Sequence, residues 1–257
     1  MPETRDHLNI EGLPIEVDIK DVDKMSGDDF IRIRRNGFGA SDSSILAGVN
    51  PYQNKFELIK SKLRTEITAE ERAVGQKSAV RKGRELEPLV IQKSSAVLDR
   101  EVMKPVDMYR FKEIPYLTIN FDGVAENLED KKSRYIPVEI KIVTKPGERH
   151  YNKSRAIFRE SELIQWQEEL PKLEGIEHLN IQQRAAYYGI PPYYYTQCQQ
   201  EMFGLDAPFS YLATLIESTW ELVIYKIWFD KDCMDTIIAE GEHLWKQIED
   251  AKNTDTL

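Results

Sequence analysis

The sequence predicts an α/β or α+β fold, in which helices surround a central sheet. Three observations indicate this fold: the first hundred residues are mostly helical in character, short β-rich segments follow, and helical segments then flank one returning strand. With 257 residues and 41% hydrophobic content, the chain can bury a sizeable core without disulfides. No linker or repeat divides it, so we expect one domain with a helical insertion.

Helix signals dominate the first hundred residues. The sequence Ser-Gly-Asp-Asp supplies a cap and acidic first turn for a helix over 26–36, which contains an arginine cluster and ends at two glycines. A short helix over 41–47 and a third over 55–63 follow. Residues 69–98 support helix almost throughout, and Pro88 is expected to break it or to begin a second segment.

Short strands are expected in the middle of the chain. Residues 106–111, 117–121 and 135–143 are β-rich and have connections of hairpin length, so they predict an antiparallel meander. The segment 145–190 is polar and mostly helical in character, including 161–170. The remaining expected elements are helices over 193–203 and 207–217, a strand over 222–229 and a terminal helix over 231–251.

The charge is unevenly distributed along the chain. A net charge of −9 argues against a general nucleic-acid binder, but residues 31–85 hold twelve Lys/Arg against six Asp/Glu, a net +6. The other 202 residues carry 23 basic and 38 acidic side chains, a net −15. A basic face on an acidic body is typical of a protein that grips phosphates in one groove. A solvated amphipathic helix is the alternative explanation.

Cysteine and histidine usage excludes several kinds of site. Cys198 and Cys233 cannot supply a disulfide framework, a four-cysteine zinc site or an iron-sulfur cluster, and the four histidines are isolated. There is no apolar run of membrane-spanning length, and the first twenty residues are charged throughout, unlike a signal peptide. We therefore expect a soluble, cytoplasmic protein.

Two acidic segments carry the most informative pattern. Asp122 lies in Asn-Phe-Asp-Gly after the second expected strand, and Glu139 lies in Glu-Ile-Lys on the third, with sixteen residues between them. Glu139 and Lys141 are two apart on a strand, so they face the same side. Carboxylates suit Mg²⁺ or Mn²⁺, and a lysine beside them can orient water or neutralise phosphate charge. An exposed ion pair on an amphipathic strand is the alternative.

Four motifs in order strengthen the nuclease interpretation. They are Arg-Asn-Gly-Phe-Gly-Ala-Ser-Asp at 35–42, Gly-Arg-Glu-Leu-Glu-Pro at 83–88, the Asp122 and Glu139/Lys141 pair, and Tyr-Tyr-Thr-Gln-Cys-Gln at 194–199. Over about residues 30–230 the chain resembles the YqaJ-type viral recombinase, or phage lambda exonuclease, family. This resemblance implies a restriction-endonuclease-like core with a central mixed sheet flanked by helices. It further implies an extension over 1–25 and one nuclease domain over 26–257 with a helical insertion at about 145–190.

The resemblance also implies roles for acidic residues. Asp122, Glu139 and Lys141 match the family's PD-(D/E)xK signature, although Phe121 stands where a proline is usual. Glu87 matches a helical glutamate that helps to bind metal, and Glu85 ranks second because Glu87 keeps the spacing from the motif's glycine. The implied metal ligands are Asp122, Glu139, the Ile140 carbonyl and Glu87.

Further positions match the family's helix and its phosphate-binding segment. Gln197 matches the glutamine of the helical motif, and Tyr194 supports it near the site. Ser41 with Arg34 or Arg35 matches the segment that holds phosphate, and an ungapped count favours Arg34. A glycine-rich approach to a helix N-terminus at Ser41 is independently a sound anion site.

The resemblance implies a Mg²⁺-dependent exodeoxyribonuclease, with Mn²⁺ as a possible substitute and without an iron-sulfur cluster. It would degrade linear double-stranded DNA 5′ to 3′ and leave a 3′ single strand for an annealing protein. A homotrimer, encoded by a phage or prophage in a bacterial host, is also implied. The alternatives are an endonuclease with the same core and a non-catalytic DNA-binding recombination scaffold. A CRISPR-associated or repair nuclease would need four cysteines for its cluster.

Other polar and aromatic residues are interpreted structurally. Lys145, Arg149, His150 and Lys153 are interpreted as a solvated surface rather than as DNA contacts. The tyrosines over 193–195 are able to stack on bases, but core packing is the preferred explanation for one face of their helix.

Overall fold

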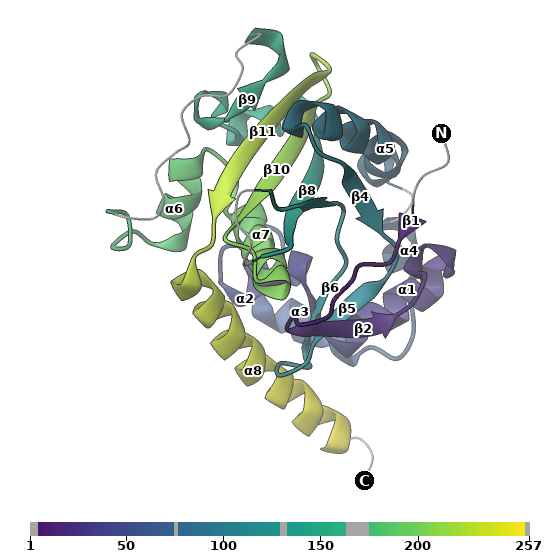
Figure 1. Cartoon of the computed structure of the whole chain (residues 1–257). Helices are drawn as coiled ribbons and strands as arrows, with labels where there is room; N and C mark the ends of the chain where they lie inside the picture. Colours follow the sequence, from purple (N-terminus) through teal and green to yellow (C-terminus); the bar gives the residue numbers. More distant parts are fainter. Residues whose placement is uncertain (1–4, 75–76, 129–132, 163–174, 255–257) are drawn as a thin grey trace.

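The strands form two sheets in the computed structural model, which describes residues 5–74, 77–128, 133–162 and 175–254 (Figure 1). A seven-stranded mixed sheet has the order β1-β4-β7-β8-β10-β11-β9, and a four-stranded sheet has the order β2-β5-β6-β3. The strands are β1 (Arg5–Asp6), β2 (Ile15–Ile19), β3 (Phe38–Gly39), β4 (Val102–Pro105), β5 (Met108–Phe111), β6 (Leu117–Ile119), β7 (Val124–Glu126), β8 (Tyr135–Val143), β9 (Phe158–Arg159), β10 (Phe209–Ile216) and β11 (Glu221–Trp228).

Helices pack on both sheets, and the predicted fold class is confirmed. Most helix starts have local causes; in α3, for example, Asn54 and Glu57 form a reciprocal capping box. No helix of the described ranges is both long and apolar enough to cross a membrane. The helices are α1 (Gly27–Ile33), α2 (Ser43–Leu46), α3 (Lys55–Leu63), α4 (Ala69–Val74), α5 (Ser78–Leu98), α6 (Ile181–Tyr188), α7 (Pro192–Leu205) and α8 (Lys231–Thr254).

Strand β8 separates two hydrophobic cores. Its even-numbered residues, such as Val138 and Ile140, pack with Val90 and Leu98 of α5 in one core. Its odd-numbered residues face α7, whose apolar side chains belong to the other core together with Tyr135 and Val143. Glu139 and Lys141 share the odd-numbered face, so the strand directs both side chains toward α7.

The chain crosses from the small sheet to the large one at residues 120–123. Strand β6 ends at Ile119 in the four-stranded sheet, and β7 begins at Val124 in the seven-stranded sheet. Gly123 permits the crossing, because a Cβ there would lie 2.9 Å from Val102 Cγ1 and 3.2 Å from the Val138 carbonyl oxygen. Asp122 is thereby held where the two sheets meet.

The predicted three-stranded meander is wrong. β5 and β6 pair antiparallel as expected, but they belong to the small sheet. β8 pairs instead with β7 on one side, antiparallel, and with β10 on the other, parallel. The connection expected between the second and third of these strands itself contains β7, a strand of three residues, so those two strands are not neighbours.

The helix expected over 207–217 is also wrong, because this stretch is β10. All eight residues of the strand are buried. It pairs with β11 along its whole length and with β8 from Tyr211 to Ile216, so strands cover both of its edges. A strand buried on both faces shows no alternation of polar and apolar residues, and periodicity alone does not distinguish it from a buried helix.

Two other helical expectations need correction. The helix over 69–98 is two helices, and α5 continues through the exposed Pro88 rather than breaking there. Packing of Val90, Ser94 and Leu98 against the sheet outweighs the lost backbone hydrogen bond.

The described part of 145–190 contains only short 3₁₀ turns, β9 and α6. Of the helix expected over 161–170, only 161–162 lie in the described residues, and they belong to a 3₁₀ turn.

Candidate active site

Lys141 bridges two carboxylates that come from different parts of the chain. Its Nζ contacts Glu139 Oε1 and lies 3.4 Å from Asp122 Oδ2. The Ile140 backbone N–H donates to the same Asp122 oxygen at 3.2 Å. The structure therefore brings the end of the sheet crossing close to the middle of β8. The sixteen-residue spacing alone did not determine whether these two segments lie together.

Burial controls the protonation of this cluster. Glu139 is fully buried, and burial together with the Asp122 charge raises the pKa of its carboxyl to about 7, against the opposing effect of Lys141. Burial disfavours the Lys141 ammonium, but the charges of Glu139 and Asp122 outweigh it and raise the pKa of Lys141 well above its usual value. Lys141 is therefore a cation at neutral pH.

Helix α5 contributes Glu87 to the same region. Glu87 and Asp122 line one pocket of about 480 Å³, together with Arg84 and Lys104. Lys104 Nζ lies 2.5 Å from Glu87 Oε1, while burial and the Asp122 charge raise the pKa of Glu87. Glu85, the competing candidate, is exposed and lies 3.8 Å from Arg81 on the same helix.

Helix α7 covers the cluster with Tyr194 and Gln197. The Lys141 ammonium lies 5.2 Å from the centre of the Tyr194 ring. One turn later, Gln197 Nε2 donates to Glu201 Oε1 at 3.2 Å. The structure thus brings Tyr194 and Gln197 to the same side of β8 as Glu139 and Lys141.

Glu201 is a site residue that the sequence analysis missed. It is buried, and its carboxyl is in hydrogen-bonding contact with that of Glu139. Burial and the neighbouring Glu139 charge raise the pKa of Glu201 well above its usual value. Its i, i+4 spacing from Gln197 was the available signal. Lys104 was also missed, because β4 was not predicted.

The oxygen ligands of this cluster fit a hard divalent cation. Asp122, Glu139 and Glu87 supply carboxylates, and Glu139 Oε2 is buried and has no hydrogen-bond partner among the described residues. Within those residues no three acidic, histidine or cysteine side chains are already close enough to enclose an ion. The Lys141 ammonium instead contacts both Glu139 and Asp122 and compensates one of their negative charges.

A second polar cluster surrounds Ser41. The Arg34 guanidinium donates to Ser41 Oγ at 2.7 Å and lies 3.6 Å from Asp42 Oδ1. Behind them Lys62 is buried and pairs with Asp42 Oδ2 at 2.8 Å. Ser41 follows β3, which pairs with β6, the strand that leads to Asp122. Arg34 and Ser41 are thus adjacent and partly exposed, as an anion site requires.

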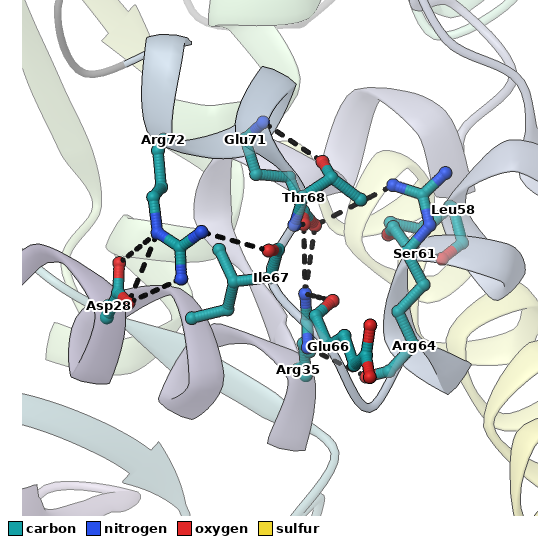
Figure 2. A network of polar contacts seen from close by, with 10 residues as sticks. All are labelled: Asp28, Arg35, Leu58, Ser61, Arg64, Glu66, Ile67, Thr68, Glu71 and Arg72. Atoms are coloured by element: carbon teal, nitrogen blue, oxygen red, sulfur yellow. Dashed lines mark hydrogen bonds and ion pairs between the residues drawn. The ribbon is translucent and has the colours of Figure 1, made fainter.

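Arg35 belongs to a network of polar contacts with the 64–68 loop and α4 (Figure 2). Its guanidinium is buried and donates to the carbonyl oxygens of Arg64 and Glu66 and to the carboxylate of Glu71. Arg72 extends the network to Asp28 of α1 at 2.9 Å. The terminal nitrogens of Arg35 therefore join the 3₁₀ turn Arg34–Asn36 to the 64–68 loop and α4, and Arg72 joins α4 to α1.

The fold is similar to that of solved exonucleases. LHK-Exo in complex with dAMP aligns with a TM-score of 0.53 and 16% identity, covering 89% of this chain and 97% of that one. The alkaline exonuclease LHK-Exo from Laribacter hongkongensis aligns with a TM-score of 0.51, also at 16% identity and with the same coverage. At this identity the likeness establishes the fold alone.

The sequence itself carries a family signature. No curated protein matches it significantly. The model of the YqaJ-like viral recombinase domain matches residues 29–204, which is more than half of the chain and includes every site residue discussed above. The resemblance inferred from four short motifs is therefore confirmed, and the chain belongs to the YqaJ-like viral recombinase family.

Proposed function

We propose that this protein is a Mg²⁺-dependent exodeoxyribonuclease that degrades linear double-stranded DNA from the 5′ end. One observation carries the proposal: Lys141 bridges the carboxylates of Asp122 and Glu139 beside Glu87, in a chain of a recombinase family whose solved neighbours in fold are exonucleases. Metal-assisted hydrolysis of a phosphodiester uses oxygen ligands for the ion and is aided by a cation beside the attacked phosphate, and this cluster supplies both.

Each side chain has a role in the proposed reaction. Asp122, Glu139 and the Ile140 carbonyl would hold Mg²⁺, and Glu87 would complete its outer shell. When bound, the ion supplies an acidified water and neutralises charge on the scissile phosphate. Because Lys141 is protonated at neutral pH, it donates hydrogen bonds to the water or the phosphate rather than removing a proton. Gln197 would orient the attacking water, and Tyr194, whose ring lies against Lys141, would limit access of solvent to it.

The Arg34–Ser41 pair is proposed to hold a DNA phosphate. Arg34 presents a partly exposed guanidinium, and the Ser41 hydroxyl beside it is a second donor. Lys62 balances the buried Asp42 carboxylate behind them, which would otherwise repel an anion. Engagement of a terminal phosphate there would favour digestion from the 5′ end. The remaining 3′ strand would pass to an annealing protein, and a homotrimer is proposed as the working assembly.

The test compares linear duplex DNA bearing 5′-phosphates with the same sequence as a covalently closed circle. Each substrate is incubated with Mg²⁺ or with a chelator, using wild type and Lys141→Ala. We expect Mg²⁺-dependent loss of the linear DNA alone and no cleavage by the variant. Labels on either strand then report polarity, because 5′ digestion releases a 5′ label first.

The other outcomes assign the alternatives. Cutting of the closed circle would indicate an endonuclease with the same core. Absence of cleavage by folded wild-type protein that still binds DNA would indicate a non-catalytic recombination scaffold. Digestion with chelator present would contradict the metal requirement.

A further inference from the structure

Tyrosine rings form a continuous path from Lys141 to the molecular surface. The Tyr194 ring, 5.2 Å from Lys141 Nζ, contacts Tyr193 with ring centres 4.5 Å apart. Tyr193 in turn contacts Tyr52 edge-on at 5.9 Å, and Tyr151 stacks on Tyr194 at 6.4 Å. The path ends at Tyr52, which is 78% exposed, so a large aromatic face is presented to solvent three rings away from the site.

The path lines a groove that carries positive charge. The groove has a volume of about 640 Å³ and lies between the loop at Pro51, the 3₁₀ turn Glu148–His150 and the start of α7. Its wall includes Tyr52 and Tyr193 together with the exposed side chains of Arg149 and His150. The groove thus combines flat apolar faces with a guanidinium within one surface.

Core packing explains Tyr151 and Tyr194, which pack against the core that faces α7, but not Tyr52 and Tyr193. Tyr195, the next residue on α7, is fully buried and donates to Asp230 at 2.7 Å, as a core tyrosine does. Tyr193 is only partly buried and Tyr52 is exposed, and neither packs against a core of the described residues. Burial raises the pKa of Tyr193 and, against the opposing charge of Lys141, that of Tyr194. Both rings therefore stay uncharged at neutral pH and do not repel phosphates.

We propose that this groove binds unpaired nucleotides of a DNA strand that continues from the scissile phosphate at Lys141. Tyr52 and Tyr193 stack on the bases, while Arg149 neutralises the backbone. Nucleobases fit this chemistry because stacking on aromatic rings beside a cation is how single strands are bound without sequence preference. Paired bases expose no such faces. The inference rests on the proposed action on DNA, and it gives the helix 193–203 and the basic turn, interpreted above as structural, a role in substrate binding.

Binding of a 12-nucleotide single strand containing 2-aminopurine tests the proposal, with Ca²⁺ in place of Mg²⁺ to prevent cleavage. Stacking quenches 2-aminopurine fluorescence, so the readout reports the contact itself. We expect Tyr52→Ala to raise Kd about tenfold and to weaken the quenching. Tyr52→Phe should bind within about twofold of wild type, because it keeps the ring. The matched control is Trp220→Ala, which removes another exposed aromatic from the β10–β11 turn and should change nothing.

Closed-circular duplex DNA, which has no unpaired end, should bind equally well to wild type and Tyr52→Ala. The proposal is overturned if Tyr52→Ala binds the single strand like wild type, if it loses affinity equally for the closed circle, or if Tyr52→Phe is as weak as Tyr52→Ala. Parallel digestion of linear duplex with Mg²⁺ separates the two claims. Wild type that binds through Tyr52 without cleaving would refute the nuclease activity alone, whereas normal cleavage with no effect of Tyr52→Ala on binding would refute the groove alone.

Discussion

At the scale of single residues, the site depends on the charged groups around the buried Glu139 carboxyl. It faces an ammonium on one side and the Glu201 carboxyl on the other, inside a protein interior that disfavours charge. Lys141 compensates one negative charge, but Asp122, Glu139 and Glu201 together bring up to three. A bound divalent cation would supply the missing positive charge, so protonation and metal binding compete at Glu139.

This competition predicts how Mg²⁺ affinity depends on pH. Burial and the Asp122 charge raise the pKa of Glu139 to about 7, so below pH 7 the carboxyl carries a proton that Mg²⁺ must displace. We expect the Mg²⁺ concentration for half-maximal cleavage to rise about tenfold per pH unit below 7 and to level off above it. Mg²⁺ titrations of the cleavage rate at pH 6, 7 and 8 measure this. Equal values at pH 6 and pH 8 would contradict it.

Replacing Arg34 and replacing Arg35 by alanine should have different effects on stability and on DNA binding. Arg35 is buried and satisfies three acceptors, so Arg35→Ala should lower the free energy of unfolding by about 2 kcal/mol or more. Arg34 is partly exposed, so Arg34→Ala should leave stability nearly unchanged and weaken binding of 5′-phosphorylated ends. Urea denaturation and competition between phosphorylated and unphosphorylated duplexes measure the two effects. The reverse pattern would show that Arg35 is the phosphate ligand.

At the scale of elements, local signals were predictable from sequence and distant pairings were not. Residues 55–63 form a helix with the expected bounds because a capping box fixes its start. Alternation along β8 correctly placed Glu139 and Lys141 on one face, and the helix carrying Gln197 was also recognised. β10 was mistaken for a helix, and Glu201 was missed, because their environments depend on strands and carboxylates remote in sequence.

The sheet crossing is an element whose geometry is testable. A Cβ at position 123 would meet Val102 Cγ1 and the Val138 carbonyl, so Gly123→Ala should separate β7 from β4 and β8 and displace Asp122. We expect a loss of about 1–3 kcal/mol in stability and a larger proportional loss of cleavage. Gly83→Ala is the matched control, because its Cβ meets no described atom within 4 Å and alanine favours the α5 helix. It should raise stability by up to about 1 kcal/mol, as thermal unfolding would report.

At the scale of the whole molecule, an acidic protein must attract a polyanion. The basic segment 31–85 reaches the site through α5, since Arg84 lines the pocket with Glu87 and Asp122. Most of its other cations are engaged locally; Arg72 pairs with Asp28, Lys55 with Glu240 and Lys62 with Asp42. Few of the twelve basic residues are therefore available to phosphates, and the acidic remainder of the chain repels DNA elsewhere.

This distribution predicts a modest salt dependence of DNA binding. Each phosphate neutralised contributes about −0.9 to the slope of log K against log salt, so the slope should indicate far fewer than twelve contacts. Arg84→Ala should weaken binding of linear duplex and reduce the slope by about one. Lys231→Ala is the control, because that ammonium is exposed on α8 and lies 2.5 Å from Asp235. The slope is measured from DNA affinities in Ca²⁺ at about 50 to 200 mM salt, a range over which affinity changes strongly. An unchanged slope for Arg84→Ala would mean that DNA does not approach the site from the side of α5.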